Sequence, residues 1–177
     1  MIFELIAAFV AGLAVAGIAM AIRWLSRGLL PKWIVPAAAG LGMLSYSIWS
    51  EYSWFSRATN AMPAGVEVAW LNEDHAFWRP WSYYKPVIDR FTAVDTRSAQ
   101  RHPNQPGQVM IDVILAARWQ LPTQIRVLFD CTNNRRADLL GEGIAVAEDG
   151  SVTGAKWVDL EADNPVLRAA CQETETP

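Results

Sequence analysis

The side chains able to do chemistry are few and scattered along this chain of 177 residues. Its two histidines, His75 and His102, stand in loop-like stretches, and neither belongs to an HExxH, HxxE or CxxC spacing. A zinc site needs three or four converging ligands. The sequence therefore predicts no metal ion, no cofactor and no catalytic residue. An enzyme that uses the loop around His102 is kept as a third alternative.

The chain has two cysteines, Cys131 and Cys171. Cys131 falls on the apolar face of a strand expected over 125–131, and Cys171 follows Leu167 by four residues, on one face of an expected helix. If that face packs on the sheet, the two sulfurs can form a disulfide in an oxidising compartment. Spacing alone leaves open two separate buried thiols, because free cysteine is often a core residue.

An aromatic segment, HAFWRPWSYYKPV over residues 75–87, has no clear repeat period and is broken by two prolines. Trp and Tyr combine an apolar body with a polar edge, which suits a membrane interface or a protein–protein contact. Arginine can stack on such rings or meet lipid phosphates. We expect partner or membrane contact from Trp78, Arg79, Trp81, Tyr83 and Tyr84. The alternative is that Phe77, Trp78 and Trp81 fill the core of their domain.

Two apolar runs precede this segment, over residues 2–22 and 33–49, and the second can be extended to residue 55. The first is long enough to span a hydrocarbon core of about 30 Å, and Pro36 suits the first turn of a second helix. The chain begins MIFELIAAF, with an acid and no cation, whereas a cleaved signal peptide begins with a basic region. We therefore expect a transmembrane helical hairpin over residues 1–56.

The connection between the two runs, residues 23–32, carries Arg23, Arg27 and Lys32. The positive-inside rule places this loop in the cytoplasm. Both termini and the C-terminal domain are then periplasmic, and the membrane is a bacterial inner membrane. The spans have no Asp, Lys, Arg or His in their interiors, which favours an anchor or docking surface over a transport pathway.

Small residues recur every four positions in both runs, and such residues let helix backbones approach closely. The expected packing residues are Ala8, Gly12, Ala16, Ala38 and Gly42. The alternative is that alanine is simply abundant here.

Residues 57–177 have the composition of a soluble domain large enough for one core. Strands are expected at 65–71, 91–95, 109–119, 125–131, 143–147 and 155–160, with a polar loop at 96–108 and a turn at EDGS, residues 148–151. Asn164 is expected to cap a short final helix that starts at Pro165, before a solvated tail. The fold class is thus a helical hairpin plus a small, mainly antiparallel β domain with a C-terminal helix.

The order VDTRS, long strand, FDC, RRADL, EDGS, KWVDL and a helix ending in AAC resembles the periplasmic surface-adhesin E-like domain family. The matching positions are Asp130, Cys131, Gly150, Trp157 and Cys171, and the resemblance covers residues 91–171. It implies a small β domain with a disulfide, and it implies no chemistry. This chain departs from the family in its two-helix hairpin and its aromatic segment.

The net charge of −3 and the absence of a basic stripe argue against a nucleic-acid partner. The sequence predicts a non-enzymatic accessory or assembly subunit of a larger membrane complex. Its partners would be other membrane protein subunits and the lipid bilayer. The alternative is a free-standing, adhesin-like binding module of the cell envelope.

Overall fold

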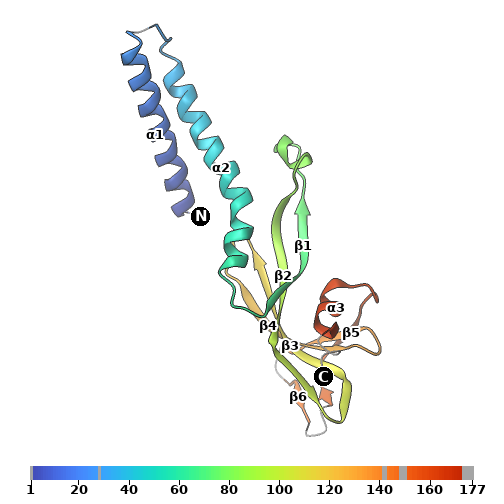
Figure 1. Ribbon diagram of the computed structural model, residues 1–177. Helices are drawn as coiled ribbons and strands as arrows, with labels where there is room; N and C mark the ends of the chain where they lie inside the picture. The colour runs from blue at the N-terminus through green and yellow to red at the C-terminus, as the bar shows by residue number, and fades with distance from the viewer. Residues whose placement is uncertain (1, 28, 141–142, 148–150, 173–177) are drawn as a thin grey trace. The chain divides into compact units, whose positions relative to one another are not determined.

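The computed structural model describes residues 2–27, 29–140, 143–147 and 151–172. The chain forms two compact units, Met1–Arg57 and Ala58–Pro177. The first unit is a helical pair, and the second is an antiparallel sheet with a short helix (Figure 1).

The helical pair consists of α1 (Ile2–Leu25) and α2 (Ile34–Asn60), which lie side by side (Figure 1). Pro36 lies in the first turn of α2, where its missing amide costs no helical hydrogen bond. Within the described residues, α1 alone has the length and apolar composition to cross a membrane. The second helix is three residues longer but more polar towards its end, so its membrane insertion stays a prediction.

The contact between the two helices is built around two glycines. Gly12 of α1 faces Met43, and a methyl group on its α-carbon would come within 2.7 Å of that side chain. Gly42 of α2 faces Val15, and the same addition would come within 2.8 Å. Because each glycine has only hydrogen at this position, the helix backbones can approach closely. The predicted packing alanines, Ala8, Ala16 and Ala38, are partly buried.

A polar contact joins the same two helices near the start of α1. The Ser50 hydroxyl donates a hydrogen bond to Oε1 of Glu4 over 3.1 Å. The carboxylate therefore has a partner on α2, which helps to set the register of the pair.

The second unit contains a six-stranded antiparallel sheet in the order β1-β2-β3-β4-β5-β8. Its strands are β1 (Val66–Asp74), β2 (Val87–His102), β3 (Gln105–Ala117), β4 (Thr123–Asp130), β5 (Arg135–Asp138) and β8 (Trp157–Asp159). A separate two-stranded ribbon pairs β6 (Ala145–Val146) with β7 (Val152–Thr153). The prediction of a mainly antiparallel β domain is confirmed.

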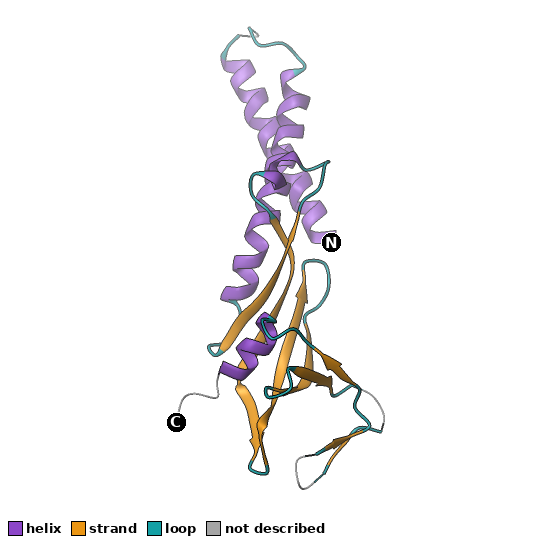
Figure 2. Ribbon diagram, turned by 90° about the vertical axis from the view of Figure 1, so that its right-hand side faces the viewer, coloured by secondary structure: helices purple, strands orange, loops and turns teal. Residues whose placement is uncertain are grey.

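The core of this unit lies between the sheet and α3 (Pro165–Gln172), which packs against β1 to β4 (Figure 2). Alternate side chains of β3 and β4 point to it, as the period of two predicts. The buried residues of the cluster are Val94, Val109, Ile111, Val113, Val127, Phe129, Leu167 and Ala170.

The final helix starts as the sequence predicts. The side-chain oxygen of Asn164 accepts hydrogen bonds from the amides of Val166 and Leu167, each over 3.1 Å, and Pro165 takes the first helical position. A disulfide then joins Cys171 of α3 to Cys131, just after β4, with 5.9 Å between their α-carbons. The helix is therefore tied to the sheet by both a packed face and a covalent bond.

The predicted loop over 96–108 is wrong, because β2 and β3 continue through most of it and turn between His102 and Gln105. The register shifts between Asp95 and Gln100, where the Ser98 hydroxyl accepts a hydrogen bond from the Asp112 amide over 2.8 Å. A polar, irregular hairpin lacks the apolar alternation by which strands are recognised.

The strand β5 was missed for the same reason. Residues 148–150 of the predicted turn and the tail at 173–177 lie outside the described residues.

The edge pairing of β1 with β2 is interrupted twice. Ala69 is an extra residue in β1, and Asp89 is an extra residue in β2. The Asn72 side chain donates a hydrogen bond to Asp89 beside the second irregularity. Bulges of this kind bend and twist an edge strand.

Candidate functional site

The aromatic segment forms the tip of the long hairpin between β1 and β2. Its outward side chains are large, and the structure leaves most of their surface accessible. The exposed fractions are 81% for Phe77, 66% for Trp78, 66% for Tyr83 and 96% for Tyr84. These four rings are called the aromatic tip below. An isolated exposed apolar residue is ordinary, but four aromatic rings gathered on one turn mark a contact surface.

The turn that carries these rings is held from within by Ser82, which is fully buried. Its hydroxyl donates to the Arg79 carbonyl over 2.7 Å and accepts from the Ala76 amide over 3.0 Å. Ser82 lies in a 3-10 helix, η1 (Pro80–Tyr83), whose first residue is a proline with a preset φ angle. One small hydroxyl thus bonds both sides of the turn and orders its backbone.

Polar side chains from the end of β1 and from the residue after it brace the same turn. His75 donates from Nδ1 to the Ser82 carbonyl oxygen over 2.8 Å, and its ring stacks on Tyr83 with centroids 5.8 Å apart. Arg79 forms an ion pair with Asp74, with 2.6 Å between Nη2 and Oδ2. His75 is therefore a structural support of the tip, with one ring nitrogen already bonded.

The predicted contact residues divide into two groups. Trp78, Tyr83 and Tyr84 are exposed on the aromatic tip, whereas Arg79 and Trp81 are half-buried beneath it. Phe77, which the sequence suggested as a core residue, is exposed and stands at 4.9 Å from the Trp78 ring. The alternative that Phe77 and Trp78 fill the core is wrong. Periodicity could not show this, because the turn has no repeat.

A second cluster of polar groups lies within the sheet. Asp112 of β3 accepts hydrogen bonds from Arg126 over 2.8 and 3.2 Å and from Gln124 over 2.9 Å. The bond from the Arg126 guanidinium holds the pKa of Asp112 below its usual value. Asp95 on the neighbouring strand is bonded by Arg97 over 2.9 and 2.8 Å, which likewise lowers the pKa of Asp95. Both carboxylates of this cluster, Asp95 and Asp112, are thus paired with an arginine.

Asp130, next to the disulfide, organises the turn that follows β4. Burial raises the pKa of Asp130, but hydrogen bonds from the side chain and amide of Asn133 and from Arg135 outweigh it, and the net pKa is lowered. These bonds hold the chain where Cys131 meets α3. Asp130 is therefore a support of the disulfide region.

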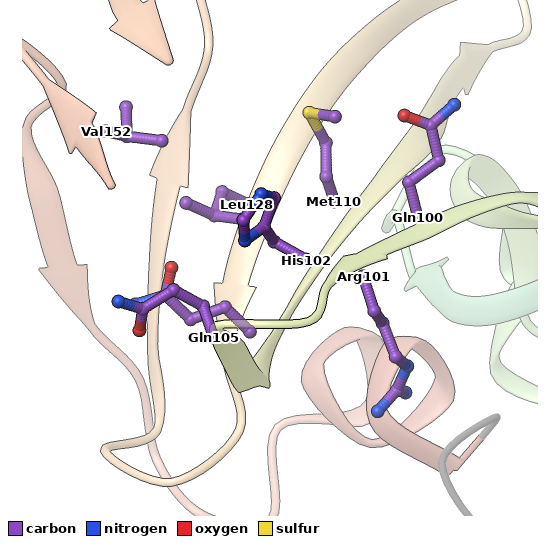
Figure 3. Close-up of a pocket in the computed structure, with 8 residues that line it drawn as sticks. Gln100, Arg101, His102, Gln105, Met110, Leu128 and Val152 are labelled. Carbon is purple, nitrogen blue, oxygen red and sulfur yellow. The ribbon is translucent and has the colours of Figure 1, made fainter. Parts of the chain in front are cut away.

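A cavity of about 120 Å³ lies where the β2–β3 hairpin faces β7 (Figure 3). Its walls combine amides, a cation and apolar groups, from Gln100, Arg101, His102, Gln105, Gln108, Met110, Leu128 and Val152. Cavities that enclose drug-sized ligands measure about 300–1,000 Å³. This cavity is large enough for a few water molecules or a small polar group.

His102 contributes to that cavity, and its Nδ1 accepts a hydrogen bond from the Asn104 amide over 3.3 Å. Across residues 2–27, 29–140, 143–147 and 151–172, no group of three His, Cys, Asp or Glu side chains converges as a metal site would require. The aromatic tip is therefore taken as the candidate contact site of the β unit.

Comparison with known protein families, curated proteins and solved structures finds no match to this chain. The resemblance to the surface-adhesin E-like family stays a prediction.

Proposed function

We propose that this protein is a membrane-anchored accessory or assembly subunit of a larger bacterial membrane complex, acting through contacts and not through catalysis. In this proposal both helices of the pair enter the inner membrane, with the loop at 23–32 in the cytoplasm and the β unit in the periplasm. A disulfide in the β unit suits that oxidising compartment.

The observation that carries the proposal is the outer surface of the helical pair. The two helices bury only a narrow contact, and α1 turns large apolar side chains outwards all round, including Leu5, Phe9, Leu13, Met20 and Ile22. A helix that is apolar on every side requires lipid or other helices around it. A subunit of a membrane complex meets both.

Extraction in a mild detergent tests the proposal. The full-length protein should co-purify with larger membrane proteins in fixed ratio. Replacing Phe9 and Leu13 by alanine removes bulk from one outward face of α1 while leaving the Gly12 contact intact, so it should reduce co-purification without preventing membrane insertion. The matched control, Ile18→Ala with Leu25→Ala, removes similar bulk from the opposite side of α1.

The alternative, a free-standing binding module, predicts the opposite result. If the protein is extracted alone, and both double variants behave like the wild type, the subunit proposal is wrong.

The topology has its own test. A cysteine at Ser26 should resist a membrane-impermeant thiol reagent in cells permeabilised only at the outer membrane, because the loop carries the positive charges. A cysteine at the exposed Leu121 of the β unit should react under the same conditions. The reverse pattern would place the β unit in the cytoplasm.

A further inference from the structure

We infer that the aromatic tip enters the interface of the same bilayer that holds the helical pair, and that it forms a second, reversible membrane contact. This inference rests on the proposed function, because it requires the anchor to be in a membrane. It names the lipid interface, and not a protein, as the partner of the tip.

The chemistry of the exposed rings fits lipid. Trp and Tyr are enriched at membrane–water interfaces, where their apolar bodies meet acyl chains and their polar edges stay hydrated. The aromatic tip supplies Trp78, Tyr83 and Tyr84 together with the wholly apolar Phe77. Lys85, which follows them, is exposed and can extend its ammonium to lipid phosphates.

The hydrogen bonding within the tip is compatible with a position in the lipid interface. Inside the bilayer an unpaired amide costs several kcal/mol, because lipid tails offer no partner. Five amides of the tip already have acceptors within it: those of Ala76, Arg79, Ser82, Tyr84 and Lys85. Pro80 and Pro86 have no amide hydrogen to satisfy.

The charge of Arg79 is also neutralised within the tip by its ion pair with Asp74. Lipid tails would supply no counter-charge, so this ion pair lowers the cost of bringing Arg79 to the lipid interface.

The chain connection brings the bilayer within reach. Only residues 61–65 separate the end of α2 from the start of β1. The strand β1 has nine residues, which at 3.3 Å per residue cover about 30 Å. Residues 61–74 thus join the aromatic tip to α2, and their extended length of about 50 Å sets the upper limit of its reach.

The experiment uses the full-length protein reconstituted alone in phospholipid vesicles. Tyr84→Cys is labelled with an environment-sensitive fluorophore, and the native cysteines do not react because they are bonded to each other. The vesicles contain lipids that carry a spin-label quencher either near the headgroup or deep in the acyl chain. A second preparation labels Phe77→Cys and keeps Tyr84, so that the result does not depend on one side chain.

Both tip labels should be quenched several-fold more strongly by the shallow quencher than by the deep one. A label at Asn104→Cys, which is exposed on the turn between β2 and β3 at the opposite end of these strands, should respond to neither. A label at Leu13→Cys on α1 should respond to the deep quencher and reports on the anchor itself.

The outcomes separate the two proposals. If the Leu13→Cys label is quenched while both tip labels behave like the Asn104→Cys label, the lipid contact is wrong and the anchor stands. If the tip labels report an aqueous environment in these vesicles but are shielded from water in native membranes, the partner of the tip is a protein. If Leu13 is not quenched, the membrane anchor and the proposed function both fail.

Discussion

Asp95 of β2 and Asp112 of β3 lie directly opposite each other in the sheet, and each carboxylate is hydrogen-bonded to an arginine of its own. Like charges in this position destabilise a pair of strands. Here Arg97 and Arg126 remove that cost, so the two acids can remain ionised side by side. The pairing links the sheet's stability to pH.

Acid should therefore weaken the β unit in a defined range. Asp95, Asp112 and Asp130 have lowered pKa values in the folded protein, whereas an unfolded aspartate titrates near a pKa of about 3.9. Below that pH the unfolded chain binds more protons, so stability falls as pH drops towards the folded pKa values. Asp112→Asn should melt lower than the wild type at pH 7 and lose less on acidification.

The measurement is thermal unfolding in mild detergent between pH 7 and pH 3. The control is Glu67→Gln, since Glu67 is exposed on β1. If the unfolding temperature of Asp112→Asn falls as much between pH 7 and pH 3 as that of the wild type, Asp112 does not contribute to the acid sensitivity.

The glycine contact of the helical pair should tolerate no added side chain. Gly12→Leu forces a branched side chain against Met43, and such overpacking costs about 1–3 kcal/mol. Gly17 lies in the same helix with nothing within 4 Å of an added methyl group, so Gly17→Leu is the matched control. Gly12→Leu should lower the unfolding temperature in detergent, and Gly17→Leu should not. Equal effects of the two changes would show that the contact is not specific.

Loss of the disulfide should destabilise the β unit by a similar amount whichever cysteine is changed. The bond closes a loop of 40 residues, which in the chain-entropy model contributes about 3–4 kcal/mol. Cys131→Ser, Cys171→Ser and the double variant should unfold at similar denaturant concentrations, because each removes the same bond. Thiol alkylation after denaturation without reductant should add no label to the wild type. Two labels would contradict the bond.

The folded turn of the aromatic tip should depend on Ser82 and not on the exposed ring of Tyr84. Ser82→Ala leaves the Ala76 amide without its acceptor, a loss of about 1–3 kcal/mol at a buried site. Hydrogen exchange should then accelerate at the amides of Arg79 and Lys85. Tyr84→Ala removes a ring that is almost entirely exposed, so exchange at these amides should stay as in the wild type. Faster exchange in both variants would mean that Tyr84 also holds the turn.

The elements with a clear period could be predicted from the sequence. Val109, Ile111 and Val113 alternate as a half-buried strand does, and the Asn164–Pro165 pair marks the start of α3 through ordinary capping chemistry. The apolar run over residues 2–22 likewise predicted the long helix α1, because it has the length to cross a membrane as a helix.

The elements without a period could not be predicted. The β2–β3 hairpin is held in its polar part by Ser98 and by backbone pairing, which no hydrophobic pattern reveals. At the aromatic tip, sequence identified the segment but could not decide which rings face outwards. Burial there depends on Ser82, whose hydroxyl makes its bonds across the turn, and a serine between a tryptophan and two tyrosines carries no such signal.

The two irregularities at the edge of the sheet limit how this protein can associate with others. An edge strand with regular spacing is a template on which a further strand can add, and that is a common route to fibres. Extra residues at Ala69 and Asp89 break the spacing of β1 and its neighbour, and Glu67 and Glu73 are exposed along β1. A strand from another molecule could not form a continuous ladder of hydrogen bonds with β1, and it would meet the negative charges of the two glutamates. The β1 edge of the sheet is thus protected against the addition of a strand from another molecule.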